Sequence, residues 1–282
     1  MALQRVLIAG CGDLGTDLGK RLAAEGSEVW GLRRRNDPLP APLNTLRADL
    51  TRPDTLALPE KLDAVVYLAT PGRYEDEAYR LAYVEGLRNL IAQLGEQRPR
   101  LVLVSSTAVY GQIEGEWVDE RSPAEPRSFS GQRMLEAEEI ARTSALPATV
   151  VRFGGIYGPG RERMLRKVRA GEPCAAQPPH YTNRIHREDC IGILQNLRRV
   201  DVPEGLYLGV DDAPCTQCEL MDHLAELMNL PRPERQPAPP GGLRGSNKRC
   251  SNAKLKQSGY RLLYPTYREG YREMIESAGE GL

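Results

Sequence analysis

The sequence has no excess of charge, since Lys and Arg together number 38 and so do Asp and Glu. A chain without net charge has no long-range electrostatic attraction to nucleic acid or to an anionic membrane, so it is not expected to bind either. It also has no apolar run of the length that spans a bilayer. The opening MALQRVLIAG runs straight into an expected strand and leaves no length for a signal peptide. We therefore expect a cytoplasmic protein that acts on a small molecule, with no nucleic-acid or membrane partner.

Histidine and cysteine are scarce, with three and six residues. Cys215 and Cys218 form a C-x-x-C, but no second Cys or His pair follows at the spacing of a zinc site. The surroundings are not those of a thioredoxin-like redox pair either. The stretch instead predicts the start of an amphipathic helix with Thr216 as its N-cap. We expect no metal, and we expect all six cysteines to be reduced.

Apolar strands alternate with helical patterns in the first half of the chain. Strands are expected at 5–10, 28–32, 45–50, 64–70, 101–106 and 148–153, and helices at 14–25, 76–96 and 131–144. Nearly continuous apolar strands with helical crossovers indicate a parallel sheet that is covered on both faces. After about residue 154 proline and glycine become frequent, and helical patterns return at 186–199, 216–229 and 265–277.

The segment GCGDLG, from Gly10 to Gly15, follows the first expected strand and opens a helix. In this position G-x-G-x-x-G predicts a dinucleotide site. Gly10 permits the tight turn, Gly12 lets the backbone approach a pyrophosphate, and Gly15 lets the helix pack against the strand. The helix N-terminus at Asp13 and Leu14 then offers amide groups to the phosphates. The fold class is therefore a Rossmann-type doubly wound α/β sheet.

The choice between the two nicotinamide cofactors is made at the end of the second strand. That strand runs into Arg33, Arg34 and Arg35, and the first acid after them is Asp37. A fork of guanidinium donors suits a 2′-phosphate better than a ribose hydroxyl. We expect NADP as the cofactor and NAD as the less favoured one.

The chain resembles the extended short-chain dehydrogenase/reductase family, the group that includes sugar-nucleotide epimerases and dehydratases. Six stretches carry the resemblance in order: ADL at 48–50, YLAT at 67–70, SSTAVYG at 105–111, RFGGIYGPGR at 152–161, RIHREDCIGIL at 184–194 and SNAKLKQSGYRLLYPTYREGY at 251–271. The resemblance implies that Asp49 holds the adenine amino group, with Leu50 beside it. It implies that Leu68, Ala69 and Thr70 pass beside the cofactor. It also implies that Ser106 is the catalytic Ser/Thr.

The change of pattern after about residue 154 predicts a dinucleotide-binding core, residues 1–154, and a small substrate lobe. The lobe takes most of 155–282, with segments at about 184–210 returning to the core. The resemblance also implies a homodimer formed through 76–96 and 131–144. The expected core-facing row of 76–96 is Leu81, Val84, Leu87, Ile91 and Leu94. Ala78, Ala82 and Leu90 lie off that row and favour a second apolar face.

The catalytic Tyr-x-x-x-Lys of this family is missing. In SFSGQRMLEAE, residues 128–138, alignment on the family's final acid at Glu138 places Ser130 at the tyrosine position and Met134 at the lysine position. A shift of one residue places Phe129 and Arg133 there instead. Neither register supplies a phenol, and a serine hydroxyl has no pKa suited to the proton transfer. The chain is therefore identified as an atypical member of the family.

Two hypotheses follow. In the first, an NADP(H)-binding oxidoreductase or epimerase/dehydratase-like enzyme acts on an unknown carbonyl or sugar-nucleotide-type substrate. Ser106 would orient a carbonyl, Tyr110 or Tyr157 would supply a phenol, and His186 would be an acid–base group. Tyr110, Tyr157 and His186 each also have a purely structural interpretation. In the second hypothesis, the protein is a non-catalytic NADP(H)-binding redox sensor or regulator. The retained Ser106 motif favours the enzyme.

Overall fold

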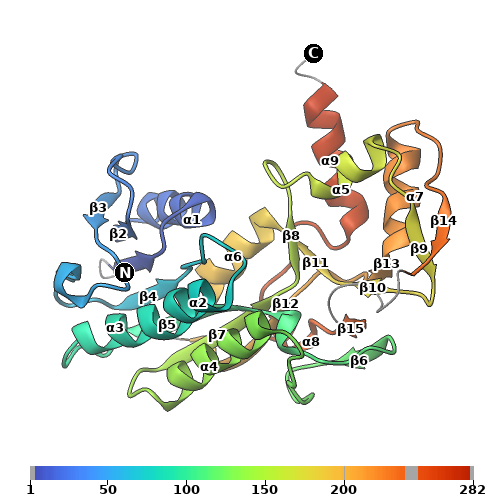
Figure 1. The fold of residues 1–282 in the computed structure, drawn as a ribbon. Coiled ribbons are helices and arrows are strands. Elements are labelled where there is room, and N and C mark those ends of the chain that lie inside the picture. Colours follow the sequence, from blue (N-terminus) through green and yellow to red (C-terminus); the bar gives the residue numbers. More distant parts are fainter. Residues whose placement is uncertain (1–3, 200, 239–246, 280–282) are drawn as a thin grey trace. The chain divides into compact units, whose positions relative to one another are not determined.

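The computed structural model describes residues 4–199, 201–238 and 247–279 (Figure 1). Its main sheet has seven strands in the order β12-β7-β5-β4-β1-β2-β3. In chain order they are β1 (Arg5–Ala9), β2 (Glu28–Arg33), β3 (Asn44–Arg47), β4 (Ala64–Tyr67), β5 (Arg100–Ser106), β7 (Ala148–Phe153) and β12 (Gly205–Gly209). β1 pairs in parallel with β2 and β4, β2 with β3, and β4 with β5. The chain builds outward through β2 and β3, then crosses back to β4, so the predicted doubly wound fold is confirmed.

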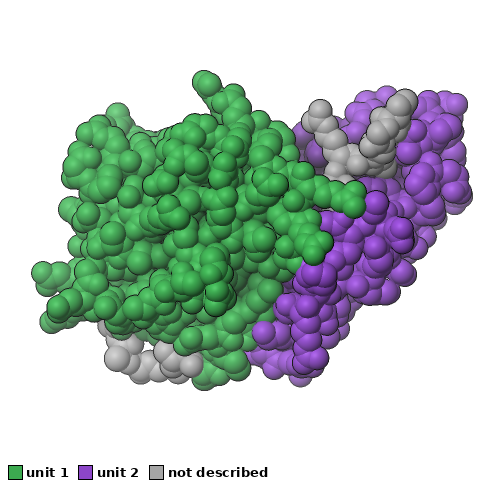
Figure 2. Space-filling model, turned by 60° about the horizontal axis from the view of Figure 1, so that its bottom comes forward, with its two compact units in different colours: residues 1–109, 124–152, 191–207 green, residues 110–123, 153–190, 208–282 purple. Residues whose placement is uncertain are grey.

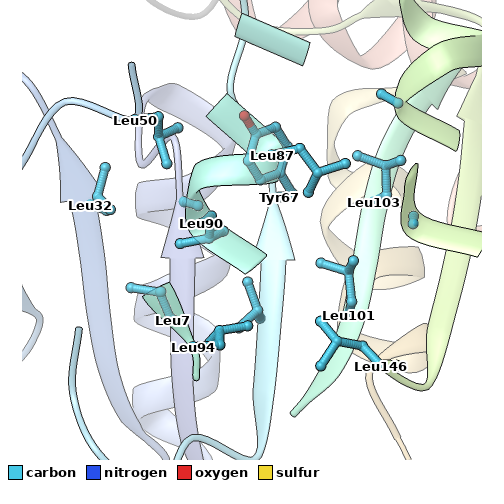
Figure 3. Close-up of a cluster of buried hydrophobic side chains, with 14 of the residues drawn as sticks. Leu7, Leu32, Leu50, Tyr67, Leu87, Leu90, Leu94, Leu101, Leu103 and Leu146 are labelled. Atoms are coloured by element: carbon cyan, nitrogen blue, oxygen red, sulfur yellow. The ribbon is translucent and has the colours of Figure 1, made fainter. Parts of the chain in front are cut away.

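Helices cover both faces of this sheet. They are α1 (Asp13–Ala24), α2 (Asp76–Tyr79), α3 (Gly86–Gln93), α4 (Phe129–Thr143) and α6 (Arg187–Leu197). Because side chains alternate along a strand, Leu7 of β1 lies in the cluster that contains Leu87 of α3. The next residue, Ile8, points the other way, where a Cβ on Gly15 of α1 would lie 3.1 Å from its Cγ2. Figure 3 shows the first cluster, with Leu87, Leu90 and Leu94 gathered over the strands.

The helical stretch between β4 and β5 is not uniform. A π-helical segment (Arg80–Glu85) joins α2 to α3 and inserts a wider turn. The Tyr67 hydroxyl, at the end of β4, donates to the Ala82 carbonyl at 2.5 Å inside this segment. A Cβ on Gly86 would lie 2.6 Å from the same hydroxyl oxygen, so the glycine makes room for the tyrosine. The wider turn shifts the helical register, which changes the residues that face the core.

The chain divides into two compact units (Figure 2). Unit 1 comprises residues 1–109, 124–152 and 191–207, and unit 2 comprises 110–123, 153–190 and 208–282. The remaining strands are β6 (Glu116–Val118), β8 (Gly155–Tyr157), β9 (Cys174–Gln177), β10 (Tyr181–Thr182), β11 (Arg184–His186), β13 (Cys215–Thr216), β14 (Arg235–Pro237) and β15 (Lys248–Cys250). The remaining helices are α5 (Arg163–Arg169), α7 (Gln217–Leu227), α8 (Ala253–Gln257) and α9 (Tyr267–Gly279), and two 3₁₀ turns span Pro53–Thr55 and Thr107–Val109.

The C-x-x-C opens helix α7, as the sequence predicts. Thr216 caps the helix in a capping box with Glu219. The expectation that all six cysteines are reduced is wrong, because Cys218 forms a disulfide with Cys174. The partner comes from β9, 44 residues earlier, so sequence spacing within the C-x-x-C did not reveal it. Cys215 stays a buried free thiol.

The described residues contain neither a membrane-spanning helix nor a group of side chains suited to a metal ion. No helix there combines the length and the apolar character that crossing a bilayer requires. In the same ranges, no group of three or more His, Cys, Asp and Glu side chains is arranged to hold a metal ion.

Candidate functional site

A cleft of about 810 Å³ lies in unit 1, where β1 to β4 end. Each of these strands delivers a short segment to it: Gly10–Asp13 after β1, Leu32–Arg35 at the end of β2, Ala48–Thr51 after β3 and Ala69–Gly72 after β4. β1 and β4 are the neighbours between which the chain reverses its direction of winding. Crevices at this reversal, outside the carboxyl ends of the strands, are where doubly wound sheets bind ligands.

The glycine turn has the geometry that its spacing predicts. Gly10 has φ +89°, and a Cβ on it would lie 2.5 Å from the backbone of Ala69. Gly10 and Cys11 both donate their amides to the Leu32 carbonyl, at 3.1 and 2.8 Å, which ties the turn to the end of β2. Nothing lies within 4 Å of a Cβ built on Gly12. The turn therefore presents open space at Gly12, directly before the first turn of α1.

The N-terminus of α1 completes this part of the cleft. Gly12 is the N-cap and supplies no capping side chain. A 12-residue helix carries a partial positive charge at this end, which favours a bound phosphate. Asp13 lines the cleft, whereas Leu14 and Gly15 are not among the lining residues. Gly15 instead packs against Ile8, the structural role expected of the third glycine.

Arg33, Arg34 and Arg35 all line the cleft. Arg33 is the most buried, with its side chain 13% exposed, and its Nη2 pairs with Asp37 at 2.9 Å. Among the described residues, its buried Nε has no hydrogen-bond partner. Arg34 and Arg35 are exposed. The end of β2 therefore presents one fixed guanidinium and two that can move.

Asp49 and Leu50 line the cleft beyond β3. One carboxylate oxygen of Asp49 accepts hydrogen bonds from the amide and hydroxyl of Thr51, at 2.9 and 2.8 Å. Burial alone would raise the pKa of Asp49, but these bonds and nearby Arg34 hold it below the usual value. The carboxylate is therefore ionised and fixed, with its second oxygen left to accept from a ligand.

The segment after β4 brings Ala69 and Thr70 to the cleft, but Leu68 is not among its lining residues. Leu68 donates its amide to Ala9 at 2.8 Å and continues the strand pairing. Its side chain is half-buried. The backbone of Leu68 nevertheless lies close to the glycine turn, because a Cβ on Gly10 would lie 2.8 Å from the Leu68 carbonyl carbon.

The helix after β4 lines the cleft with residues that the sequence assigned elsewhere. Ala78, Leu81 and Ala82 all contribute to the wall. The sequence predicts Leu81 in the core and the two alanines on a dimer face. Leu81 and Ala82 lie in the π-helical segment, whose wider turn shifts the helical register, and Ala82 also packs against the core cluster. Leu90, the third residue off the expected row, is fully buried in the core.

Other lining residues carried no recognised signal. They are Cys11, Thr16, Asp17, Thr51, Pro71 and Gly72. Most of these residues directly follow a residue of a predicted motif. A prediction that covered each complete turn, and not only the motif positions, would have included them. Together the cleft offers a helix N-terminus, three guanidinium groups and a fixed carboxylate. These groups fit a phosphate-bearing dinucleotide.

Ser106 ends strand β5, and its hydroxyl accepts from the Ala108 amide at 3.1 Å. The neighbouring Ser105 hydroxyl donates to Glu138 of α4 at 2.5 Å. Glu138 also forms a buried bidentate pair with Arg152 of β7, the closest N–O distance being 2.6 Å. The family's final acid is thus retained as the anchor that holds α4 to the sheet.

The positions that the sequence alignment assigns to the catalytic pair hold side chains that contact other parts of unit 1. Ser130 is buried and lies 3.0 Å from the hydroxyl of Ser128. Ser128 itself is the N-cap of α4 and accepts from the Gly131 amide. Met134 packs against the core cluster of unit 1. Arg133 forms a bidentate ion pair with Asp76, at 2.7 and 2.8 Å, so its charge is already engaged.

Tyr110 and His186 lie in unit 2. The Tyr110 side chain is buried, and its hydroxyl donates to the Asp119 carbonyl at 2.7 Å. His186 is 2% exposed and packs between the rings of Tyr157 and Tyr264. Desolvation lowers the pKa of His186 to about 4, so the ring stays neutral near pH 7.

Tyr157 and Asp189 also have structural surroundings in unit 2. The Tyr157 ring stacks on Tyr271 at 4.4 Å, and burial raises the pKa of its phenol far above the usual value. Asp189, the acid of the His-x-x-Asp stretch, accepts from the Tyr260 hydroxyl at 2.9 Å and from the backbone amides of 263 and 264. This stretch therefore fastens the closing segment 251–271.

Comparison with known proteins agrees with this geometry. The model of the NAD dependent epimerase/dehydratase family matches residues 6–193. A solved structure from Methylobacillus flagellatus, assigned to the NAD-dependent epimerases/dehydratases, is 43% identical with a TM-score of 0.83, over 99% of this chain and 100% of that chain. Protein YeeZ of Escherichia coli (strain K12) is 28% identical over 246 residues, 82% of this chain and 86% of YeeZ.

A further relative carries a named activity. The dTDP-6-deoxy-L-talose 4-dehydrogenase (NAD(P)(+)) of Kitasatospora kifunensis is 30% identical over 220 residues, 73% of this chain and 69% of that enzyme. The family model covers residues 6–193, and the groups that line the cleft fit a dinucleotide. Both observations support a nicotinamide cofactor. The chain belongs to the NAD-dependent epimerase/dehydratase family of NAD(P)-dependent, oxidoreductase-like enzymes.

Proposed function

We propose that this protein is an NADP(H)-dependent oxidoreductase or epimerase/dehydratase-like enzyme that acts on a carbonyl or hydroxyl carbon of a sugar-nucleotide-type substrate. The observation that carries the cofactor choice is the set of three arginines at the end of β2, all lining the cleft. When bound, the nicotinamide cofactor supplies or accepts a hydride. The chain's own residues bind and orient it.

The arginines support a 2′-phosphate for a physical reason. Arg33 is largely buried and held by Asp37, so little side-chain entropy is lost when it contacts an anion. The carboxylate of Asp37 is occupied by that pair. Arg34 lies close enough to lower the pKa of Asp49, which places positive charge between the ends of β2 and β3. A hydroxyl-bearing ribose would gain less from this charge than a phosphate.

Calorimetric titration of NADPH and NADH into the wild type and an Arg33→Ala, Arg34→Ala variant tests the cofactor choice. We expect the wild type to bind NADPH more tightly than NADH. The double variant should lose about tenfold or more in NADPH affinity, since hydrogen bonds to charged groups contribute about 1.5–3 kcal/mol, and should bind NADH almost unchanged.

An Arg88→Ala, Arg98→Ala variant is the matched control. Both arginines are exposed residues of unit 1 outside the cleft, so the variant removes the same charge without touching the site. Equal affinities for the two cofactors, or the same loss in both double variants, would overturn the proposed NADP(H) preference.

The substrate class is proposed from the relative that acts on a dTDP-sugar. We propose that unit 2 carries the substrate-binding residues, as the small lobe expected from the sequence. Absorbance of NADPH at saturating cofactor, followed across a panel of UDP- and dTDP-sugars and their keto forms, tests this. Cofactor binding without turnover across the panel would contradict the substrate class.

A further inference from the structure

Helix α4 supplies no phenol at the position where the family's catalytic tyrosine is expected. The tyrosine position at Ser130 lies at the start of α4, buried, with only a short hydroxyl. Among the described residues, one phenol reaches it from another segment. The Tyr74 hydroxyl lies 3.4 Å from the Ser130 hydroxyl, although the two residues are 56 positions apart in the sequence.

Aromatic packing fixes Tyr74 at this place. Its ring centroid lies 4.9 Å from that of Phe129 and 5.6 Å from that of Tyr79, the latter edge to face. Phe129 and Tyr79 also contact each other, at 5.5 Å and edge to face. The Arg133–Asp76 ion pair joins the same two segments, two residues after Tyr74 and four after Phe129.

Tyr74 is nevertheless accessible. Its side chain is 64% exposed, the largest value among the exposed apolar and aromatic residues described. A structural tyrosine in an aromatic cluster would be expected to bury its ring, whereas a proton donor must keep its hydroxyl open to a substrate. The contact to Ser130 is long for an O–H···O bond, so it orients the phenol without engaging it strongly.

Tyr74 is not itself among the residues that line the cofactor cleft, but it lies between two parts of the chain that are. The wall of the cleft includes Gly72, two residues before it, and Ala78, four residues after it. Tyr74 therefore lies in the one stretch that leaves the cleft after Gly72 and returns to it at α2. All of these residues, and Ser130 and Phe129, belong to unit 1.

We propose that Tyr74 is the catalytic proton donor and acceptor of this protein, in place of the missing family tyrosine. The proposal rests on the proposed function, because it requires a nicotinamide cofactor in the cleft. In the direction of reduction, the Tyr74 O–H bond breaks and its proton joins the substrate carbonyl oxygen. The carbonyl carbon receives the hydride from the reduced cofactor, and C=O becomes CH–OH. In the direction of oxidation the Tyr74 phenolate takes the hydroxyl proton. Ser130 positions the phenol, and Ser128 positions Ser130.

The ¹³C chemical shift of the Tyr74 Cζ in the two cofactor complexes tests the proposal without a substrate. NADP⁺ and NADPH carry the same phosphates and differ by the positive charge of the nicotinamide ring. A phenol that serves the reacting carbon must lie close to that charge. The field of the charge should therefore give the Tyr74 Cζ a different chemical shift in the NADP⁺ complex and in the NADPH complex.

Spectra of protein labelled with ¹³C at the tyrosine Cζ would be recorded in each complex at one pH. Tyr74→Phe assigns the Tyr74 resonance, and Tyr79→Phe assigns that of its aromatic neighbour. We expect the chemical shift of Tyr74 to differ between the two complexes and that of Tyr79 to differ much less. Failure of both cofactors to bind would defeat the proposed function. Binding of both with equal Tyr74 chemical shifts would overturn this inference alone.

Kinetics provide a second measurement once a substrate is in hand. Tyr74→Phe should lower kcat by about a hundredfold or more and leave the cofactor affinity unchanged. Tyr79→Phe, the control from the same cluster, should change kcat by less than about threefold. Ser130→Ala should cost less than about tenfold, because it removes only the long orienting contact. Full activity in Tyr74→Phe would refute the role.

Discussion

Gly10 and Gly12 lie two residues apart in one turn, yet they meet different constraints. Alanine at Gly10 would have to adopt φ +89° and would place its Cβ 2.5 Å from the Ala69 backbone. Backbone cannot move aside as a flexible side chain can. We expect Gly10→Ala to lower the free energy of unfolding by roughly 3 kcal/mol or more, measured by urea denaturation.

Gly12→Ala is the matched variant. Its φ of −93° suits alanine, and nothing lies within 4 Å of the added Cβ. Because Gly12 is the N-cap of α1, where alanine is less favourable than glycine, the variant should lose about 1 kcal/mol or less of its free energy of unfolding, well below the loss in Gly10→Ala. Its methyl group would occupy the space where a pyrophosphate approaches. NADPH affinity should therefore fall by about tenfold or more. A stable Gly12→Ala that binds NADPH normally would show that the phosphates lie elsewhere.

Single residues with a local role were predictable. The glycine spacing, the arginines after β2 and the Thr216 cap each act within a few residues of their own position, and each lies where the sequence places it. Tyr74 and Arg152 were not predictable in the same way. Their partners, Ser130 and Glu138, are distant in sequence, and no local pattern marks a phenol or a guanidinium for a particular fold contact.

At the scale of the element, helix α4 is fastened to the sheet by one buried acid. Glu138 fastens it to β7 through Arg152, with side chains 9% and 5% exposed, and to β5 through Ser105. Replacing one member of a buried pair leaves the other charge uncompensated. We expect Glu138→Gln to lower the free energy of unfolding by about 3–5 kcal/mol.

Glu139→Gln is the control for this prediction. Glu139 pairs with Arg142 on the exposed side of the same helix, and surface pairs contribute little. Its urea midpoint should match that of the wild type. Equal stability of Glu138→Gln and Glu139→Gln would contradict the anchoring role of Glu138.

The helix after β4 shows where prediction from periodicity reaches its limit. A spacing of three and four identifies a helix, and a helical stretch does occupy 76–93 as expected. Periodicity assumes one register throughout, whereas the π-helical segment at Arg80–Glu85 divides this helix into two. Leu87 and Leu90 then lie in the core, Leu81 lines the cleft, and Ala82 lines the cleft and also packs against the core cluster. The surplus apolar residues therefore no longer support a dimer, and the homodimer stays a prediction.

At the scale of the whole molecule, the disulfide between Cys174 and Cys218 converts part of the chain into a covalent ring. The ring spans a sequence separation of 44 residues. Both sulfurs belong to unit 2, but residues 191–207 of the ring belong to unit 1. Segment 191–207 is therefore flanked in sequence by the two cysteines of one disulfide.

A ring must be cut twice before it falls apart. A site-specific protease sequence inserted after Asp201, an exposed residue of the ring, would allow one cut. The nicked chain should keep the mass of the intact chain in denaturing gels without reductant and separate into two fragments when thiol is added. The same insertion in a Cys174→Ser background should separate without reductant. Until both the peptide bond and the S–S bond are broken, the severed chain is still one molecule.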